Sequence, residues 1–96
     1  MPNRRKSADE IEFNTIVGKN IKYLRKQHKI TQTELGCVLG ISLQQIQKYE
    51  KGTNGLHSRN LNKMAHKAFN ISMDVLVDPQ MIMKHKGFKD EAVEWL

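Results

Sequence analysis

Two helix-start signals separated by a single glycine occur within residues 31–51. In a capping box, a Ser or Thr and a Glu or Gln three residues later satisfy backbone N–H groups that the first helical turn leaves free. The two pairs here are Thr31 with Glu34 and Ser42 with Gln45. Gly40 lies between them, and glycine commonly ends a helix because it adopts a left-handed conformation without a Cβ penalty. The segment therefore predicts two short helices, roughly 32–39 and 43–51, joined by a tight turn.

An isoleucine precedes each of these signals and strengthens both predictions. Ile30 can pack onto Leu35, the fourth residue of the first helix, and fix the direction from which the chain enters it. Ile41 can pack onto Ile46 in the same way. Gly36 falls where a second helix that crosses at a steep angle needs a small residue beneath it. The pattern favours two short helices packed across one another.

Hydrophobic periodicity predicts further helices, and no strands, on both sides of this pair. We expect a helix over roughly 14–28, although Asp9 with Glu12 also makes a plausible cap for an earlier start. A fourth helix is predicted after Ser58, and a short fifth helix is predicted after Ser72. Five short helices that bury one shared core give an all-α fold.

Composition divides the chain into three parts. Residues 1–10 are polar and mostly charged, which predicts a flexible basic arm. Residues 11–78 contain the five predicted helices and form the domain, whose core we expect to be complete by Leu76. Residues 79–96 form a weakly patterned tail with a final helix expected near Asp90.

The apolar residues of this tail need a partner that the pattern does not identify. They are Met81, Ile82, Met83, Phe88, Val93 and Trp95. The tail can dock on the core, pair with a second subunit or lead into further sequence. We expect it to contribute to a dimer, because it is the apolar surface left over once the domain core is filled.

Length and composition exclude several classes of protein. A chain of 96 residues supports one domain with a modest core. Its single cysteine, Cys37, excludes an internal disulfide and a multi-cysteine metal cage, and its place between Leu35 and Leu39 favours a structural thiol over a reactive one. The four histidines share no metal-ligand spacing, and no pattern of nucleophile and base appears. We therefore expect no enzyme, no metal, no cofactor and no evident small-molecule ligand.

The N-terminus lacks the apolar stretch of a signal peptide, and no apolar run is long enough to span a membrane. A cytoplasmic location is the expectation. The net charge is +6, and residues 1–60 carry eleven Lys and Arg against five Asp and Glu, whereas residues 61–96 carry five of each. This asymmetry favours a polyanionic partner that approaches the part of the chain containing the paired helices.

The second of the paired helices has one apolar and one polar face. Ile46 and Tyr49 lie three residues apart and should be core. A glutamine amide matches the donor and acceptor of adenine in the major groove, and lysine can reach guanine. The residues we expect to contact bases are Leu43, Gln44, Gln45, Gln47 and Lys48. For Leu43, contact with a thymine methyl group and packing against the preceding helix are equally compatible with the pattern.

Over roughly residues 14–77 the chain resembles the lambdoid phage repressors, the Cro-like or XRE family of helix-turn-helix regulators. The matching residues are Gln32, Leu35, Gly36, Leu39-Gly40-Ile41, Ile46, Tyr49 and Glu50-Lys51-Gly52. The resemblance implies a five-helix lambda-repressor-like domain that binds duplex DNA. Two residues depart from the family pattern: alanine is common at the position of Gly36, and polar residues are frequent at the position of Leu43.

The resemblance also implies how the domain holds the DNA backbone. The family contacts phosphates at the start of the first paired helix, where free N–H groups and the helix dipole favour an anion, and again around the loop that follows the second. We add Ser42 and Lys51, which flank the second paired helix. The residues expected to contact phosphates are then Thr31, Gln32, Thr33, Ser42, Lys51, Thr53, Asn54, His57, Ser58 and Arg59. The family further implies that Arg25 pairs with Glu50 in a structural ion pair instead of contacting a phosphate.

We therefore expect a sequence-specific regulator of transcription, acting as a repressor at an operator. It would bind an inverted repeat as a homodimer, associated with the nucleoid in a bacterial cytoplasm. An antitoxin that autoregulates through the same helix-turn-helix is the main alternative, and residues 80–96 would then bind the toxin. The DNA-binding half of a longer protein and a protein-interaction module that has lost DNA binding remain open as well.

Overall fold

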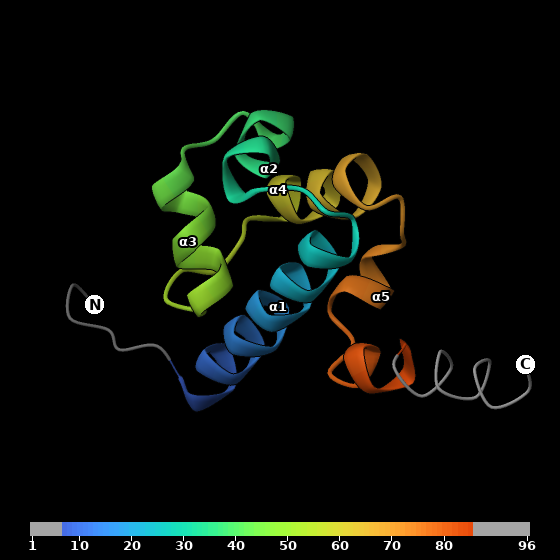
Figure 1. Cartoon of the computed structure of the whole chain (residues 1–96). Helices are drawn as coiled ribbons and strands as arrows, with labels where there is room; N and C mark the ends of the chain where they lie inside the picture. The colour runs from blue at the N-terminus through green and yellow to red at the C-terminus, as the bar shows by residue number, and fades with distance from the viewer. Residues whose placement is uncertain (1–6, 86–96) are drawn as a thin grey trace, which may run out of the picture.

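The computed structural model describes residues 7–85, and every regular element in that range is helical, as the sequence predicts. Helices α1 to α3 are Ala8–Gln27, Gln32–Leu39 and Leu43–Lys51. Helix α4, Ser58–Lys63, runs into a π-helical turn, η1, Met64–Ala68, and α5 is Met73–Leu76. Residues 81–85 are also helical. Helix α1 crosses the molecule, with α3 on one side and α5 on the other (Figure 1). The final helix expected near Asp90 lies outside the described residues.

Helix α1 begins earlier than either predicted start. The Ser7 hydroxyl accepts a hydrogen bond from the Glu10 N–H at 3.1 Å and caps the helix. Asp9 and Glu10 then lie in the first turn, where negative charge complements the helix dipole. Residues 8–10 of the predicted arm are therefore helical, and the predicted start at residue 14 is wrong.

One hydrophobic core joins all the helices. Its buried side chains are Val17, Ile21, Leu24, Leu35, Leu39, Ile46, Tyr49, Met64, Ala65, Phe69, Leu76 and Met81. The two isoleucines expected to staple the paired helices, Ile30 and Ile41, pack partly buried against it. Burial of apolar surface on this scale is the main force that holds such short helices together, because helices of this length are marginal in isolation.

The core extends beyond Leu76, although the sequence predicted that it would be complete there. Asp78 accepts hydrogen bonds from the Gln80 N–H at 2.8 Å and from Lys84 at 2.9 Å, which start the helical turn over residues 81–85. These bonds hold the pKa of Asp78 below its usual value. The turn places Met81 in the core with 5% of its surface exposed, whereas Met83 stays 71% exposed. Met81 is therefore not part of a surface left for a partner.

A buried amide ties α1 to the end of α5. Asn20 is 1% exposed, and its Nδ2 donates to the carbonyl oxygens of Leu76 at 2.8 Å and Asp78 at 2.9 Å. Buried carbonyl groups need such donors, since an unsatisfied one costs free energy. The two bonds fix where the chain turns after α5.

Two glycines allow close approaches between backbones. A Cβ at Gly18 would lie 2.4 Å from the carbonyl oxygen of Tyr49, so α1 meets the end of α3 backbone to backbone. A Cβ at Gly36 would lie 2.7 Å from the carbonyl oxygen of Ile41. The small residue at position 36 is thus required by the turn after α2, in addition to the crossing helix. Alanine there would push the turn outwards.

Of the caps predicted for α4 and α5, the first is wrong and the second is confirmed. Ser58 is the first residue of α4 and not its cap, since His57 occupies the cap position without a side-chain hydrogen bond. Ser72 caps α5 as predicted, because its hydroxyl accepts from the Val75 N–H at 3.4 Å. Between the two helices, η1 ends at Ala68, and the next residue, Phe69, packs against the ring of His28 at a centroid separation of 5.3 Å.

Candidate nucleic-acid interface

A complete capping box starts α2 as predicted, whereas the second predicted box, at the start of α3, is reduced to the cap by the Ser42 hydroxyl. The Thr31 hydroxyl accepts from the Glu34 N–H at 3.0 Å, and the Glu34 carboxylate accepts from the Thr31 N–H at 2.9 Å. The Thr31 N–H, and to a lesser extent the Thr31 hydroxyl, hold the pKa of the Glu34 carboxyl below its usual value. Gly40 ends α2 with a φ of 74°, and the Ser42 hydroxyl accepts from the Gln45 N–H at 3.2 Å to start α3. The turn thus follows the local rules that its sequence suggests.

Helix α3 buries one face and presents the other. Ile46 is fully buried and Tyr49 is 2% exposed, as the sequence predicts. The residues expected to read bases all retain accessible surface: Leu43, Gln44 and Lys48 are exposed, and Gln45 and Gln47 are partly exposed. Leu43 is 36% exposed, which leaves room for a contact with DNA beside any packing against α2. An amide-rich and basic face therefore stands free immediately after the turn.

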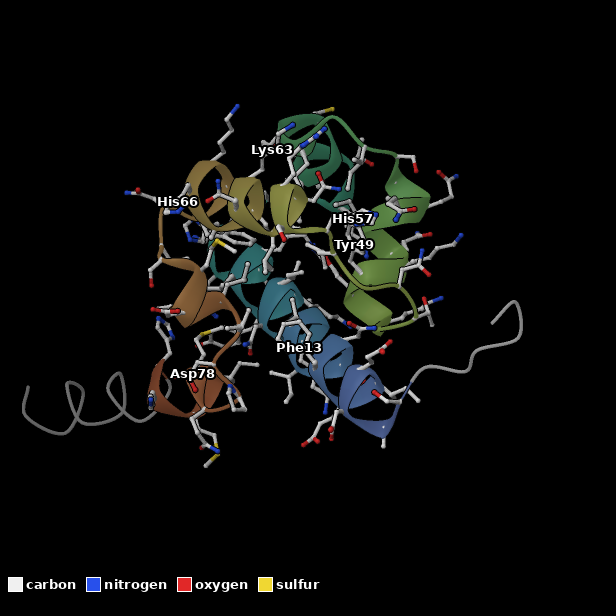
Figure 2. All side chains as sticks on the ribbon, turned by 180° about the vertical axis from the view of Figure 1, so that it is seen from behind. Phe13, Tyr49, His57, Lys63, His66 and Asp78 are labelled. Carbon is white, nitrogen blue, oxygen red and sulfur yellow. The ribbon has the colours of Figure 1, made fainter. Side chains whose placement is uncertain are left out.

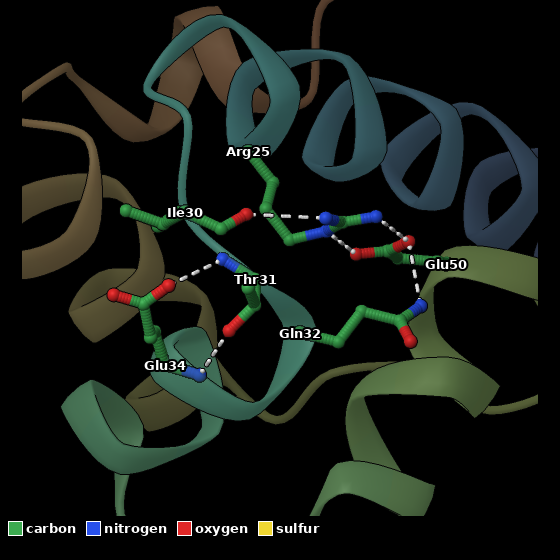
Figure 3. A network of polar contacts seen from close by, with 6 residues as sticks. All are labelled: Arg25, Ile30, Thr31, Gln32, Glu34 and Glu50. Carbon is green, nitrogen blue, oxygen red and sulfur yellow. Dashed lines mark hydrogen bonds and ion pairs between the residues drawn. The ribbon is translucent and has the colours of Figure 1, made fainter.

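The C-terminal end of α3 is held by the ion pair that the family resemblance implied. Arg25 Nε donates to Glu50 Oε2 at 2.6 Å, and Arg25 Nη2 donates to Glu50 Oε1 at 3.1 Å (Figure 3). Arg25 Nη1 also donates to the carbonyl oxygen of Ile30 at 3.1 Å. The side chains are 12% and 4% exposed, respectively. The pair therefore joins α1 to the end of α3, and its guanidinium is committed to the interior.

Gln32 belongs to the same network. Its Nε2 donates to Glu50 Oε1 at 3.1 Å, so the residue expected to contact a phosphate is already held by a carboxylate. Lys22, Gln47 and Lys51 line a cleft of about 230 Å³ together with Gln32 and Glu50. Helices α1, α2 and α3 all contribute to it. The helix periodicity of α1 gave no reason to select Lys22, which reaches this cleft only through the packing of α1 beside α3.

The loop after α3 and the start of α4 carry the other predicted phosphate contacts. Both donors of Thr53, its N–H at 3.1 Å and its hydroxyl at 3.2 Å, bond to the Lys48 carbonyl and close the end of α3. Asn54 is partly exposed. His57, Ser58 and Arg59 are exposed and line a shallow pocket of about 470 Å³ with Asn60.

The two regions expected to bind phosphates are both hydrogen-bonded to α3. Asn60 Nδ2 donates to the hydroxyl of Tyr49 at 3.3 Å; Figure 2 labels Tyr49 on α3 and His57 at the start of α4. The start of α4 is thereby positioned relative to the core face of α3. Thr53 and Gln32, both expected to contact phosphates, already donate hydrogen bonds within the fold.

The remaining polar residues do not assemble into a second site. Cys37 is exposed, which corrects the expectation of a thiol packed in the core: α2 turns Leu35, Gly36 and Leu39 inwards, and residue 37 falls outside that face. Within residues 7–85 no cluster of three or more His, Cys, Asp or Glu side chains could hold a metal ion. Over the same residues no helix is both long and apolar enough to cross a membrane.

Comparison with known proteins supports the same class. A family model described as "Helix-turn-helix" matches residues 21–76. The chain is 37% identical over 68 residues to Antitoxin PezA of Streptococcus pneumoniae, covering 70% of this chain and 42% of that protein. It is 38% identical over 65 residues to an uncharacterized HTH-type transcriptional regulator of Sinorhizobium medicae, covering 68% and 45%. A similar regulator of Sinorhizobium fredii is 33% identical over 61 residues, covering 64% and 43%.

The matched region contains α2, α3 and α4 entirely, and it includes the turn between α2 and α3. The chain belongs to the XRE-type helix-turn-helix family of transcriptional regulators. It spans less than half the length of these curated relatives.

Proposed function

We propose that the chain binds duplex DNA at a specific sequence and regulates transcription, most simply as a repressor that occupies an operator. The observation that carries the proposal is the exposed polar face of α3, which follows a capped turn and stands opposite the buried Ile46 and Tyr49. A helix presented in this way fits the major groove, whose base edges it can read through side-chain amides and amines. Such a regulator would act at the bacterial nucleoid, in the cytoplasm.

Base readout and backbone contact fall to different residues in this proposal. Gln44 in the first turn of α3 and Lys48 one turn later would meet base edges, with Gln45, Gln47 and Leu43 around them. The phosphate contacts come from the starts of α2 and α4 and from Lys51 at the end of α3. Phosphate contacts set the position of the protein on DNA but carry no sequence information directly, so specificity would depend on α3.

A homodimer would give the discrimination that one α3 lacks. One recognition helix contacts only a few base pairs, and two copies roughly double the specific free energy. Ile71 and Val75 line an apolar groove of about 540 Å³, and Val75 is 40% exposed. Met83, also exposed, follows in the next turn of the chain. We propose that a second copy covers this surface and that the dimer binds an inverted repeat with half-sites about 34 Å apart.

The antitoxin alternative is favoured by one observation, the similarity to Antitoxin PezA over 68 residues. An antitoxin of this kind would use the same α3 to bind its own promoter, and sequence beyond the domain would bind a toxin. Co-expression with the product of a neighbouring gene distinguishes the two proposals. A stable complex that relieves growth arrest supports an antitoxin, and free coexistence of the two products supports a regulator.

The proposal is tested by recovering genomic fragments that bind the purified chain and footprinting the most enriched ones. We expect a short inverted repeat that lies upstream of a gene and competes with random duplex DNA. Sedimentation of the chain with that fragment should show two copies per site. Recovery of no fragment above the random background would contradict sequence-specific binding.

A further inference from the structure

Glu50 connects three helices through one buried carboxylate. Its side chain is 4% exposed, and Oε1 accepts from both Arg25 of α1 and Gln32 of α2 at 3.1 Å (Figure 3). Oε2 accepts the shorter bond from Arg25, at 2.6 Å. The ion pair by itself explains how α1 is joined to α3. The bond to Gln32 adds a polar side chain at the first position of α2, which the ion pair does not require for its own stability.

The chemistry of a carboxylate fixes which way the Gln32 amide points. An ionised carboxylate only accepts hydrogen bonds, so the amide nitrogen of Gln32, and not its oxygen, must face Glu50. That nitrogen has two hydrogens, and the described bond uses one of them. The other hydrogen is bonded to the same nitrogen, whose position the bond to Glu50 sets. Gln32 is partly exposed and lines the cleft together with Lys22 and Lys51, so its amide is held where the cleft meets solvent.

Charge explains why a carboxylate can hold this position near a phosphate. An isolated anion beneath the start of α2 would repel the DNA backbone, whereas Arg25 supplies two N–H groups and a full positive charge to Glu50. The pair is close to neutral as seen from the cleft. Its effect at the surface is to orient the Gln32 amide.

We infer that Glu50 is a positioning residue for DNA binding: it orients the Gln32 amide so that a donor faces the phosphate before DNA arrives. The inference rests on the proposed function. Ordering a side chain before association avoids part of the entropy that binding would otherwise cost. The fold-stabilising ion pair and the grip on the DNA backbone are then two uses of one carboxylate.

A double-mutant cycle on random duplex DNA tests the inference, because phosphate contacts act on every sequence. In the unaltered background Glu50→Gln should weaken binding about two- to tenfold, since an amide at position 50 no longer forces the Gln32 nitrogen inwards. In the Gln32→Ala background the same substitution should have no further effect on binding. Equal losses in both backgrounds would overturn the inference.

Measurements of stability distinguish a positioning role of Glu50 from a merely structural one. Glu50→Gln should lower the unfolding midpoint in both backgrounds, because the bond to Arg25 changes in both. Arg25→Lys is the matched control: it keeps the positive charge and leaves Glu50 Oε1 to Gln32, so it should destabilise the fold while the folded protein binds random DNA within about twofold of normal. Loss of binding in proportion to loss of stability across all variants would contradict a positioning role.

Nuclear magnetic resonance of the unaltered protein gives a second test that does not depend on a variant folding. The side-chain amide of Gln32 should be ordered in the free protein, with an order parameter close to the roughly 0.85 of rigid backbone, and adding random duplex DNA should shift one of its two protons. An order parameter below about 0.6 in the free protein would overturn pre-orientation. Failure to bind any duplex would instead overturn the proposed function.

Discussion

Helix α1 meets α3 and α5 in two different ways. Against α3 it makes a backbone contact at Gly18 and a charged one through Arg25 and Glu50. Against the end of α5 it uses a neutral amide, Asn20, that bonds two carbonyl groups. The first junction lies beside the cleft proposed to grip DNA, and the second lies beside the apolar groove proposed to meet another copy. The surfaces proposed for DNA binding and for association thus lie on different sides of α1.

The largest effect is expected from a substitution that breaks the junction between α1 and α3. Arg25→Ala leaves the Glu50 carboxylate buried without its partner, which should cost about 3–5 kcal/mol of unfolding free energy. Lys26→Ala, which removes an exposed charge one residue away, is the control and should change stability by less than about 0.5 kcal/mol. Denaturant titration compares the two. Equal midpoints would mean that the ion pair does not hold α1 against α3.

A smaller effect is expected at the second junction. Asn20→Ala removes the donor from one buried and one partly buried carbonyl group, and we expect a loss of about 1–3 kcal/mol. Asn62→Ala, at an exposed position of α4, is the matched control and should be nearly neutral. The comparison is sharpened by DNA binding: the folded Asn20→Ala protein should keep its affinity for DNA. A marked loss of affinity would show that the two junctions are coupled.

The smallest effect concerns the cap of α2. Because hydrogen bonds from Thr31 lower the pKa of Glu34 in the folded chain, this carboxylate stabilises the fold above its unfolded pKa, and the contribution is lost as the pH falls through the folded value. The chain should therefore be more stable than Glu34→Gln at about pH 7, and the difference should shrink at about pH 3. Thr31→Val, which removes the hydroxyl, is the control. A pH-independent difference would exclude this linkage.

Local rules account for what could be predicted. The caps of α2, α3 and α5 and the left-handed Gly40 involve residues that are neighbours or lie three apart, so the sequence displays them directly. The start of α1 was missed although it follows the same rule, because several residues near the N-terminus are able to cap and the periodic apolar stripe begins only at Val17.

Contacts between distant parts of the chain could not be predicted in this way. Asn20 bonds carbonyl groups 56 and 58 residues further on, so nothing in its own neighbourhood distinguishes it from an exposed amide. Gly18 is required by the backbone of Tyr49. Met81 joins the core only because Asp78 starts a new helical turn. For the candidate site, the polar face of α3 was evident from spacing, whereas the pairing of Arg25 with Glu50 came from resemblance to a family.

The central claim is that α3 reads base edges while the residues around it hold phosphates, and Gln44→Ala tests it most directly. The binding free energy should be measured on the recovered genomic site and on random duplex DNA of equal length, at one salt concentration. We expect a loss of about 1–3 kcal/mol on the genomic site and little change on random DNA, whereas Arg59→Ala should weaken both alike. An equal loss on the two DNAs for Gln44→Ala would contradict base readout by α3.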